Sequence, residues 1–161
     1  MAGGRLLVVR HAYDPVAGQW AFPGGGIEAG ELPKGALARE VREELHVVPT
    51  VLGLLAVHHY GQALYIFGMR VDAARIRPDG REITEAAWLD RAALAELHEQ
   101  GRMLSPRDWW MAERLFARGR LPAGLQEAQY RPPADAQSGR KTAELYVAWT
   151  QTPEPPTPGN G

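Results

Sequence analysis

Three glutamates in the first third of the chain have a spacing that can hold a metal ion. Glu43 and Glu44 follow Glu40 by three and four positions in the run AREVREELHV. An α-helix turns about 100° per residue, so this spacing brings the three carboxylates onto one narrow arc. Like charges placed in this way repel each other and oppose helix formation. A hard divalent cation such as Mg²⁺ would offset that repulsion, because it prefers oxygen ligands.

A glycine-rich loop precedes these glutamates and favours a role in binding. Residues 23–30 read PGGGIEAG, a composition that disfavours regular secondary structure. Without a Cβ, the backbone groups of Gly24, Gly25 and Gly26 can approach a phosphate or a metal closely. The alternative for the glutamates is a solvated acidic helix face, which is common in proteins. The loop next to them makes the metal-binding interpretation the stronger one.

The element that must position the carboxylates is a helix predicted over residues 33–45. Pro33 suits a first helical position, and Leu37, Val41 and Leu45 recur at every fourth residue. This apolar stripe predicts one buried helix face. The three glutamates border the stripe, so packing would hold them while they still reach solvent.

Alternating apolar runs and turn residues predict a sheet around this helix. The expected strands are 5–10, 19–22, 48–60 with a bend near residue 53, 64–71 and 86–89. Residues 71–84 read as a polar connection with a turn at Asp79–Gly80. Two more helices are expected over 91–100, capped by Asp90, and 105–119. The mixture predicts an α/β (α+β) class in which a sheet packs against helices.

The spacing around the glutamates resembles the signature box of the Nudix hydrolases. The matching residues are Gly25, Glu31 after five residues, Arg39-Glu40-Val41 after seven, then Glu43-Glu44 and Val47. The flanking WAFPGGGIEAGE and EITEAAWL are also similar to family sequences, so the resemblance spans about residues 5–100. His46 departs from the pattern, because the family usually has glycine there. We expect His46 to end the helix in the left-handed conformation at a modest cost.

The resemblance implies a fold, a reaction and a cofactor. It implies a Nudix-like mixed β-sheet sandwiched between helices, and hydrolysis of a nucleoside diphosphate linked to another group. The metal, Mg²⁺ or Mn²⁺, would be held by Glu40, Glu43, Glu44 and the carbonyl of Gly24. Bound cations neutralise the diphosphate and lower the pKa of the attacking water.

The resemblance also implies supporting roles. Arg39 and Glu31 would pair to hold the loop on the helix. Glu40, Glu82 and Glu85 are candidates for the general base, and surface charge is the alternative for Glu82 and Glu85. The sequence leaves this choice open.

The sequence before the box resembles that of family members whose substrates are nucleotides of the ADP-ribose, dinucleotide or sugar-nucleotide type. A nucleoside triphosphate pyrophosphohydrolase is the first alternative; a non-catalytic nucleotide-binding module and a purely structural chain are the others. Aromatic residues could stack on the nucleotide base, although most aromatic residues in strands belong to the core. The candidates are Trp20, Phe22, Tyr65, Phe67 and Trp88.

Length, charge and composition restrict the remaining classes. The 161 residues suffice for one domain with a core, and 45% of them are hydrophobic. A formal net charge of −1 gives no sign of a nucleic-acid or polybasic membrane partner. The absence of cysteine excludes disulfides and thiolate catalysis. No apolar run is long enough to span a membrane, so we expect a soluble cytoplasmic protein.

The C-terminal part of the sequence differs in composition from the rest. We expect a Nudix domain over residues 1–130 and a tail rich in proline and glycine over 131–161, with an extra strand at 143–149. Relatives usually have a strand before the one at residues 5–10, whereas only MAGG precedes it here. A sheet without that strand has an unpaired edge, and such edges recruit other strands. Residues 143–149 would pair there, within the chain or by exchange in a homodimer; the alternative is a disordered tail.

Overall fold

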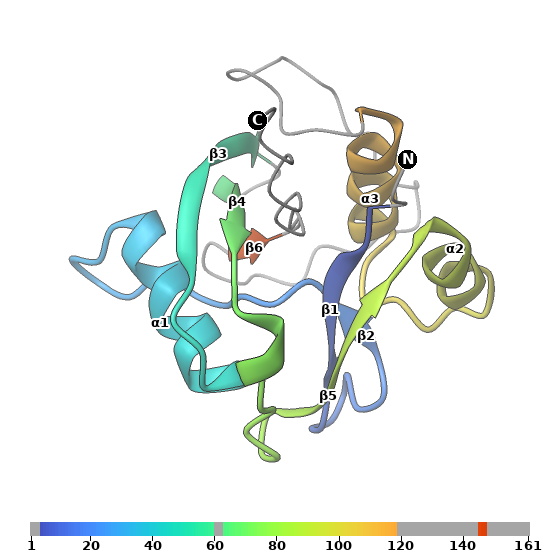
Figure 1. The fold of residues 1–161 in the computed structure, drawn as a ribbon, viewed down its shortest axis with the longest axis horizontal. Helices are drawn as coiled ribbons and strands as arrows, with labels where there is room; N and C mark the ends of the chain where they lie inside the picture. Colours follow the sequence, from blue (N-terminus) through green and yellow to red (C-terminus); the bar gives the residue numbers. More distant parts are fainter. Residues whose placement is uncertain (1–3, 60–62, 119–144, 148–161) are drawn as a thin grey trace, which may run out of the picture.

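The computed structural model describes residues 4–59, 63–118 and 145–147 (Figure 1). In chain order the elements are β1 (Leu6–His11), β2 (Trp20–Ala21), α1 (Pro33–Leu45), β3 (Thr50–His59), β4 (Ala63–Arg70), the 3₁₀ helix η1 (Ala73–Arg75), β5 (Ile83–Leu89), α2 (Arg91–Glu99), α3 (Pro106–Arg118) and β6 (Leu145–Val147).

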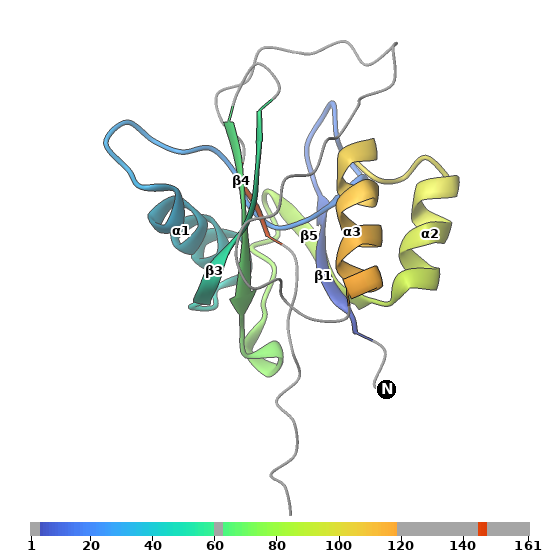
Figure 2. The same cartoon turned by 90° about the horizontal axis from the view of Figure 1, so that it is seen from above.

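The strands form two three-stranded sheets. One has the order β2-β1-β5 with antiparallel neighbours, and the other has the order β3-β4-β6. β3 and β4 are antiparallel whereas β4 and β6 are parallel, which makes the second sheet mixed. Figure 2 shows α1 on one side of the strands and α2 and α3 on the other. The predicted α+β class, with strands between helices, is confirmed.

β1 lies at the centre of the molecule and is buried on both faces. Leu7 and Val9 pack with α1 in one hydrophobic cluster, while Leu6 and Val8 pack with α2 and α3 in a second. This explains why its sequence is a continuous apolar run rather than an alternating one. The predicted stripe on α1, Leu37, Val41 and Leu45, is fully buried in the first cluster. Burial of each such side chain contributes about 1.5–3 kcal/mol.

The polar connection before β5 is shorter than the sequence predicts. β5 begins at Ile83 rather than residue 86, because Ile83 pairs with His11 of β1 and is fully buried. The connection also contains η1, which no sequence pattern predicts and which Asp72 caps by accepting a hydrogen bond from the Ala74 N–H. The bend expected in β3 near Gly53 appears as shifts of pairing register between Val51 and Gly53 and again after Leu54.

The C-terminal strand β6 lies inside the segment 143–149 for which a strand is expected. Leu145, Tyr146 and Val147 pair in parallel with Tyr65, Ile66 and Phe67 of β4. The expectation that this strand pairs at an open edge beside residues 5–10 is wrong, because β1 has β2 and β5 as its neighbours and β6 belongs to the other sheet. The boundary expected at residue 130 lies outside the described residues, so the division into a domain and a tail stays a prediction, as does strand exchange in a homodimer. Within the described part of the chain, no helix has both the length and the apolar composition needed to span a membrane.

Candidate active site

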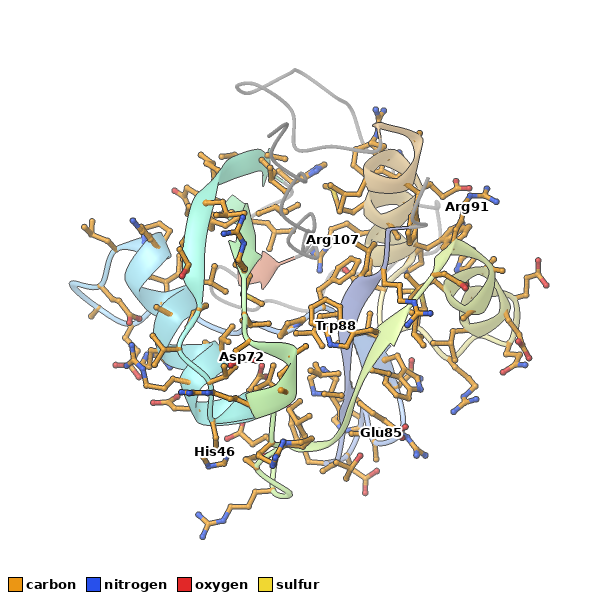
Figure 3. The ribbon with its side chains drawn as sticks, viewed as in Figure 1. His46, Asp72, Glu85, Trp88, Arg91 and Arg107 are labelled. Carbon is orange, nitrogen blue, oxygen red and sulfur yellow. The ribbon has the colours of Figure 1, made fainter. Side chains whose placement is uncertain are left out.

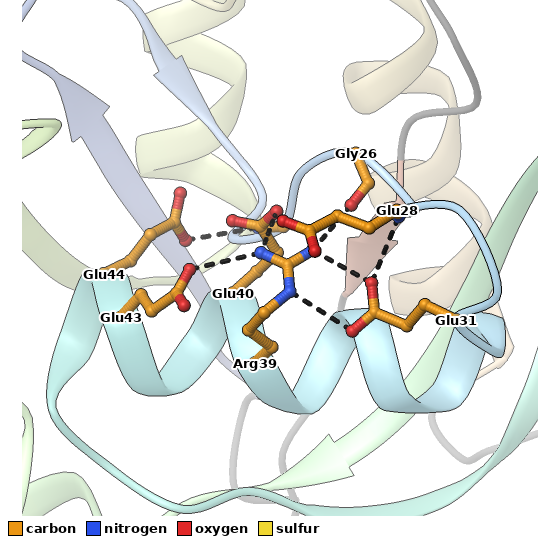
Figure 4. A network of polar contacts seen from close by, with 8 residues as sticks. Gly26, Glu28, Glu31, Arg39, Glu40, Glu43 and Glu44 are labelled. Carbon is orange, nitrogen blue, oxygen red and sulfur yellow. Dashed lines mark hydrogen bonds and ion pairs between the residues drawn. The ribbon is translucent and has the colours of Figure 1, made fainter.

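α1 sets the direction of the three glutamates predicted to hold a metal. Its buried stripe fixes the rotation of the helix, so the carboxylates point to the side that carries Arg39 (Figure 4). Their exposure differs: Glu44 is 5% exposed, the Glu40 side chain 15% and the Glu43 side chain 61%. The site therefore runs from a buried carboxylate to a solvated one along less than two turns of helix.

The glycine loop packs directly against these carboxylates. The Gly24 N–H donates a hydrogen bond of 3.3 Å to Oε2 of Glu44, and Gly24 has φ 147°, which disfavours other residues. A Cβ at Gly25 would lie 2.5 Å from Oε1 of Glu40, so this residue must be glycine for Glu40 to keep its place. For Gly24, the contact shown is made by its N–H, whereas the family resemblance implies a metal-binding role for its carbonyl.

Arg39 joins the loop to the helix. Its Nε and Nη2 donate to the two oxygens of Glu31 at 3.2 and 3.1 Å, and Nη2 also donates to the Gly26 carbonyl at 2.8 Å. Its Nη1 donates to Glu40 at 2.9 Å and to Glu43 at 3.1 Å (Figure 4). These charge-assisted bonds raise the pKa of Arg39 and lower that of Glu31. The pairing of Glu31 with Arg39 is the contact that the resemblance implies.

Two of the carboxylates are electrostatically unfavourable as they stand. Burial raises the pKa of Glu44 well above its usual value, and the charges of Glu40, Glu82 and Asp79 raise it further, against the bond from Gly24. Burial also raises the pKa of Glu40, with Glu43 and Glu82 adding to the effect and Arg39 opposing it. Burial is thus the main cause of both shifts, and the neighbouring carboxylates add to it.

Glu82 belongs to this group of carboxylates, whereas Glu85 does not. The charge of Glu82 acts on both Glu40 and Glu44. Glu85 instead lies opposite Arg10 in the β1–β5 ladder and forms an ion pair of 3.7 Å with it. Figure 3 shows Glu85 on the side of β5 away from α1. Of these two candidates for the general base, the structure brings only Glu82 to the glutamates of α1.

A β-bulge lies between Glu82 and Glu85 and changes the face on which Ile83 packs. The pairing of β1 and β5 shifts between Arg10 and His11, and Ile83 consequently packs in the α1 cluster. Ala87 and Leu89 are an even number of residues from Ile83, so a regular strand would place all three side chains on one face. They pack instead in the other cluster, with α2 and α3. A bulge changes which residues face each side of a sheet, so residues before the bulge and after it cannot be assigned by alternation alone.

Asp79 holds Glu82 in place, a role that the sequence did not reveal. Its carboxylate accepts hydrogen bonds from the N–H groups of Arg81, Glu82 and Ile83 at 2.8–3.1 Å. These bonds lower the pKa of Asp79 despite its partial burial. The Glu82 carbonyl in turn accepts a bond of 2.9 Å from the Ala12 N–H. The sequence signal was the pair Asp79–Gly80, which predicts a turn but does not predict that the Asp79 side chain binds the backbone of Glu82.

The residues present fit a hard divalent cation. In the part of the chain that the structure describes, no three Asp, Glu or His side chains are already grouped as metal ligands. Arg39 binds Glu40 and Glu43, which accounts for their present positions. The donor set is nevertheless all carboxylate oxygen, Glu44 is a buried acid with a raised pKa, and the missing Cβ of Gly25 leaves room for the Glu40 carboxylate against the loop.

The aromatic candidates for base stacking divide into buried and partly buried residues. Trp20, Phe22 and Phe67 are core residues. Tyr65 and Trp88 are partly buried and pack on the α1 cluster, which leaves them as the candidates that retain exposed surface.

Comparison with known proteins agrees with this geometry. Residues 1–109 match the family model described as the NUDIX domain. The putative 8-oxo-dGTP diphosphatase 2 of Mycobacterium tuberculosis is 32% identical over 114 residues, which cover 66% of this chain and 77% of that protein. The ADP-ribose pyrophosphatase of Methanocaldococcus jannaschii is 37% identical over 54 residues, which cover 34% of this chain and only 32% of that protein.

A solved structure extends the agreement to the fold. The NUDIX hydrolase from Nitrosomonas europaea aligns with a TM-score of 0.60 and 20% identity, covering 78% of this chain and 72% of that one. At this identity the likeness concerns the fold alone. The family match covers more than half of the chain, and it includes the glycine loop and the acidic helix described above. The chain therefore belongs to the Nudix family of pyrophosphohydrolases.

Proposed function

We propose that the protein cleaves the diphosphate linkage of a nucleoside diphosphate derivative, of the ADP-ribose, dinucleotide or sugar-nucleotide type, by attack of water at phosphorus. The observation that carries this proposal is the convergence of Glu40, Glu44 and Glu82: burial raises the pKa values of Glu40 and Glu44, and the charge of Glu82 raises both further. Such mutual repulsion is typical of a site built for a cation and an anionic substrate.

The proposed roles follow from the positions of the side chains. Glu40, Glu43 and Glu44 would hold Mg²⁺ or Mn²⁺, and the carbonyl of Gly24 stays a proposed ligand. When bound, the metal neutralises the diphosphate and favours ionisation of the attacking water. Arg39 keeps the glycine loop on α1 through Glu31 and the Gly26 carbonyl.

Glu82 is our proposed general base, because it lies beside the cluster while its backbone is fixed at both ends by Asp79 and Ala12. Its carboxylate would accept the proton of the attacking water. Glu40 is the alternative base, since it also lies in the cluster but forms an ion pair of 2.9 Å with Arg39.

A second candidate function is the hydrolysis of nucleoside triphosphates. The putative 8-oxo-dGTP diphosphatase 2 aligns with 66% of this chain, about twice the share that the ADP-ribose pyrophosphatase covers. A non-catalytic nucleotide-binding module is less favoured, because the box carboxylates Glu40, Glu43 and Glu44 are all present.

A panel of nucleotides assayed with Mg²⁺ and Mn²⁺ tests the proposal. We expect a nucleoside diphosphate derivative to be cleaved only with a divalent cation, and chelation to abolish turnover. In ¹⁸O water, mass spectrometry should find the label on a phosphate product and none on a sugar carbon. Faster cleavage of triphosphates would favour the second candidate, and binding without any product would favour the non-catalytic module.

A further inference from the structure

His46 makes contacts that a glycine could not make. It follows α1 with φ 53° in the left-handed region, and its N–H donates to the Arg42 carbonyl at 3.1 Å. Its ring Nδ1 lies 2.9 Å from the carbonyl oxygen of Arg77, 31 residues further along the chain. A carbonyl oxygen can only accept, so Nδ1 carries the proton and donates it. Figure 3 shows His46 at the end of α1, beside the connection that leads to β5.

The same connection is also attached to α1 by its backbone. The Arg77 N–H donates to the Leu45 carbonyl and the Asp79 N–H to the Glu44 carbonyl, both at 2.9 Å. Carbonyls in the last turn of a helix lack partners within the helix, so these bonds satisfy them. The ring of His46 adds a third bond between the helix end and the connection.

Asp79 links this attachment to Glu82. Asp79, whose N–H is fixed to α1, accepts bonds from the N–H groups of Arg81, Glu82 and Ile83. The position of Glu82 relative to Glu44 therefore depends on how firmly residues 77–79 are held against the end of α1.

We propose that His46 is a positioning residue that fastens residues 77–83 to α1 and so keeps Glu82 beside Glu40 and Glu44. A histidine in the left-handed region costs more than the glycine usual at this place in the box. The bond from Nδ1 to Arg77 offsets that cost and gives the helix end a tether that glycine lacks. A merely tolerated helix cap would make no use of the ring.

Two variants separate the tether from the cap. His46→Gly improves the backbone conformation and removes the ring, whereas His46→Asn keeps a residue that tolerates the left-handed region. The Asn side-chain nitrogen is bonded to Cγ, as Nδ1 of histidine is, so Asn can donate to the Arg77 carbonyl. Asp72→Ala is the matched control, because it removes a cap in the same connection, and the contacts of the Asp72 side chain are with Ala74 and Arg75 rather than with α1.

Amide hydrogen exchange of the protein without substrate gives the first readout. We expect His46→Gly to speed exchange of the Asp79, Glu82 and Ile83 amides about two- to tenfold, the range for loss of one hydrogen bond. His46→Asn should restore most of the protection, and Asp72→Ala should leave these amides unchanged. Unchanged exchange in His46→Gly, or equal loss of protection in Asp72→Ala, would overturn the proposal.

Steady-state kinetics gives the second readout, and this one rests on the proposed function. With a substrate that the wild-type protein cleaves, His46→Gly should lower kcat about two- to tenfold while KM changes little, and His46→Asn should recover the loss. Unchanged kcat in His46→Gly would contradict the positioning role. If the wild-type protein cleaves no nucleotide, the proposed function fails, while hydrogen exchange still decides the role of His46.

Discussion

Replacement of Gly25 by alanine should displace Glu40 without disturbing the loop backbone. The added Cβ would lie 2.5 Å from Cδ and Oε1 of Glu40 and 2.7 Å from Oε2, whereas ordinary contacts begin at 3.4 Å. The carboxylate would have to withdraw by about 0.9 Å, the difference between 3.4 and 2.5 Å. Gly25 does not have a positive φ, so an alanine backbone is accommodated without strain.

The displacement should affect the reaction much more than stability. Glu40 can move by rotating its flexible side chain, at a cost of about 0.5–1.5 kcal/mol for an unfavourable rotamer. For a chain of this size, about 1 kcal/mol lowers the melting temperature by roughly 2–4 °C. A misplacement of about 1 Å in a catalytic group can reduce the rate by about 10²-fold.

Gly26→Ala is the matched control for this experiment. A Cβ at Gly26 meets nothing within 4 Å, and its φ is also not positive. Initial rates with a cleaved nucleotide and Mg²⁺, together with calorimetry, should find Gly26→Ala close to wild type and Gly25→Ala about 10²-fold slower. Equal rates for the two variants would refute the argument that Glu40 must keep its place beside Gly25.

Glu44→Gln should abolish turnover yet raise the melting temperature of the metal-free protein, because burial holds the pKa of Glu44 well above 4.5. As pH rises above 4.5, Glu44 ionises in the unfolded chain at a lower pH than in the folded chain, which destabilises the folded wild-type protein. The increase in melting temperature of Glu44→Gln over wild type should therefore be absent at lower pH and grow as pH rises. An equal increase at pH 3 in calorimetry would contradict this. Glu82→Gln should lower kcat with little change in Mn²⁺ affinity, whereas Glu85→Gln, whose partner is Arg10, should stay near wild type; the reverse result would exclude Glu82 as the base. Truncation after Lys141 removes β6 and should lower the melting temperature or abolish a dimer, and a truncated protein that melts and sediments like the full chain would exclude a role for the strand.

Most of α1 and its chemistry could be predicted from local sequence. The predicted bounds, 33–45, equal those observed, and the stripe of Leu37, Val41 and Leu45 is buried as expected. The contact between Glu31 and Arg39 likewise follows from a spacing within a single loop and helix. These features depend on the period of the helix and on residues close in sequence, which a sequence displays directly.

The contacts of the residues after the helix depend instead on long-range packing. The pattern of the chain offered Glu82 and Glu85 equally. The turn at Asp79 and the bond from Ala12 hold Glu82 beside the cluster, whereas pairing with β1 places Glu85 opposite Arg10. The start of β5 and the contact of His46 with Arg77 likewise depend on contacts between residues far apart in the chain.

The sequence by itself therefore determined the chemistry of the protein: an acidic helix behind a glycine loop, in a spacing that identifies the Nudix family. Only the tertiary structure decided which distant carboxylate joins that helix and how it is held there. The physical reason is that the period of a helix is a local property, whereas the place of Glu82 depends on a turn and on pairing with β1, which is far away in the chain. The register of β1 and β5 is likewise not visible in the sequence: one bulge puts Ile83 on the face opposite to Ala87 and Leu89.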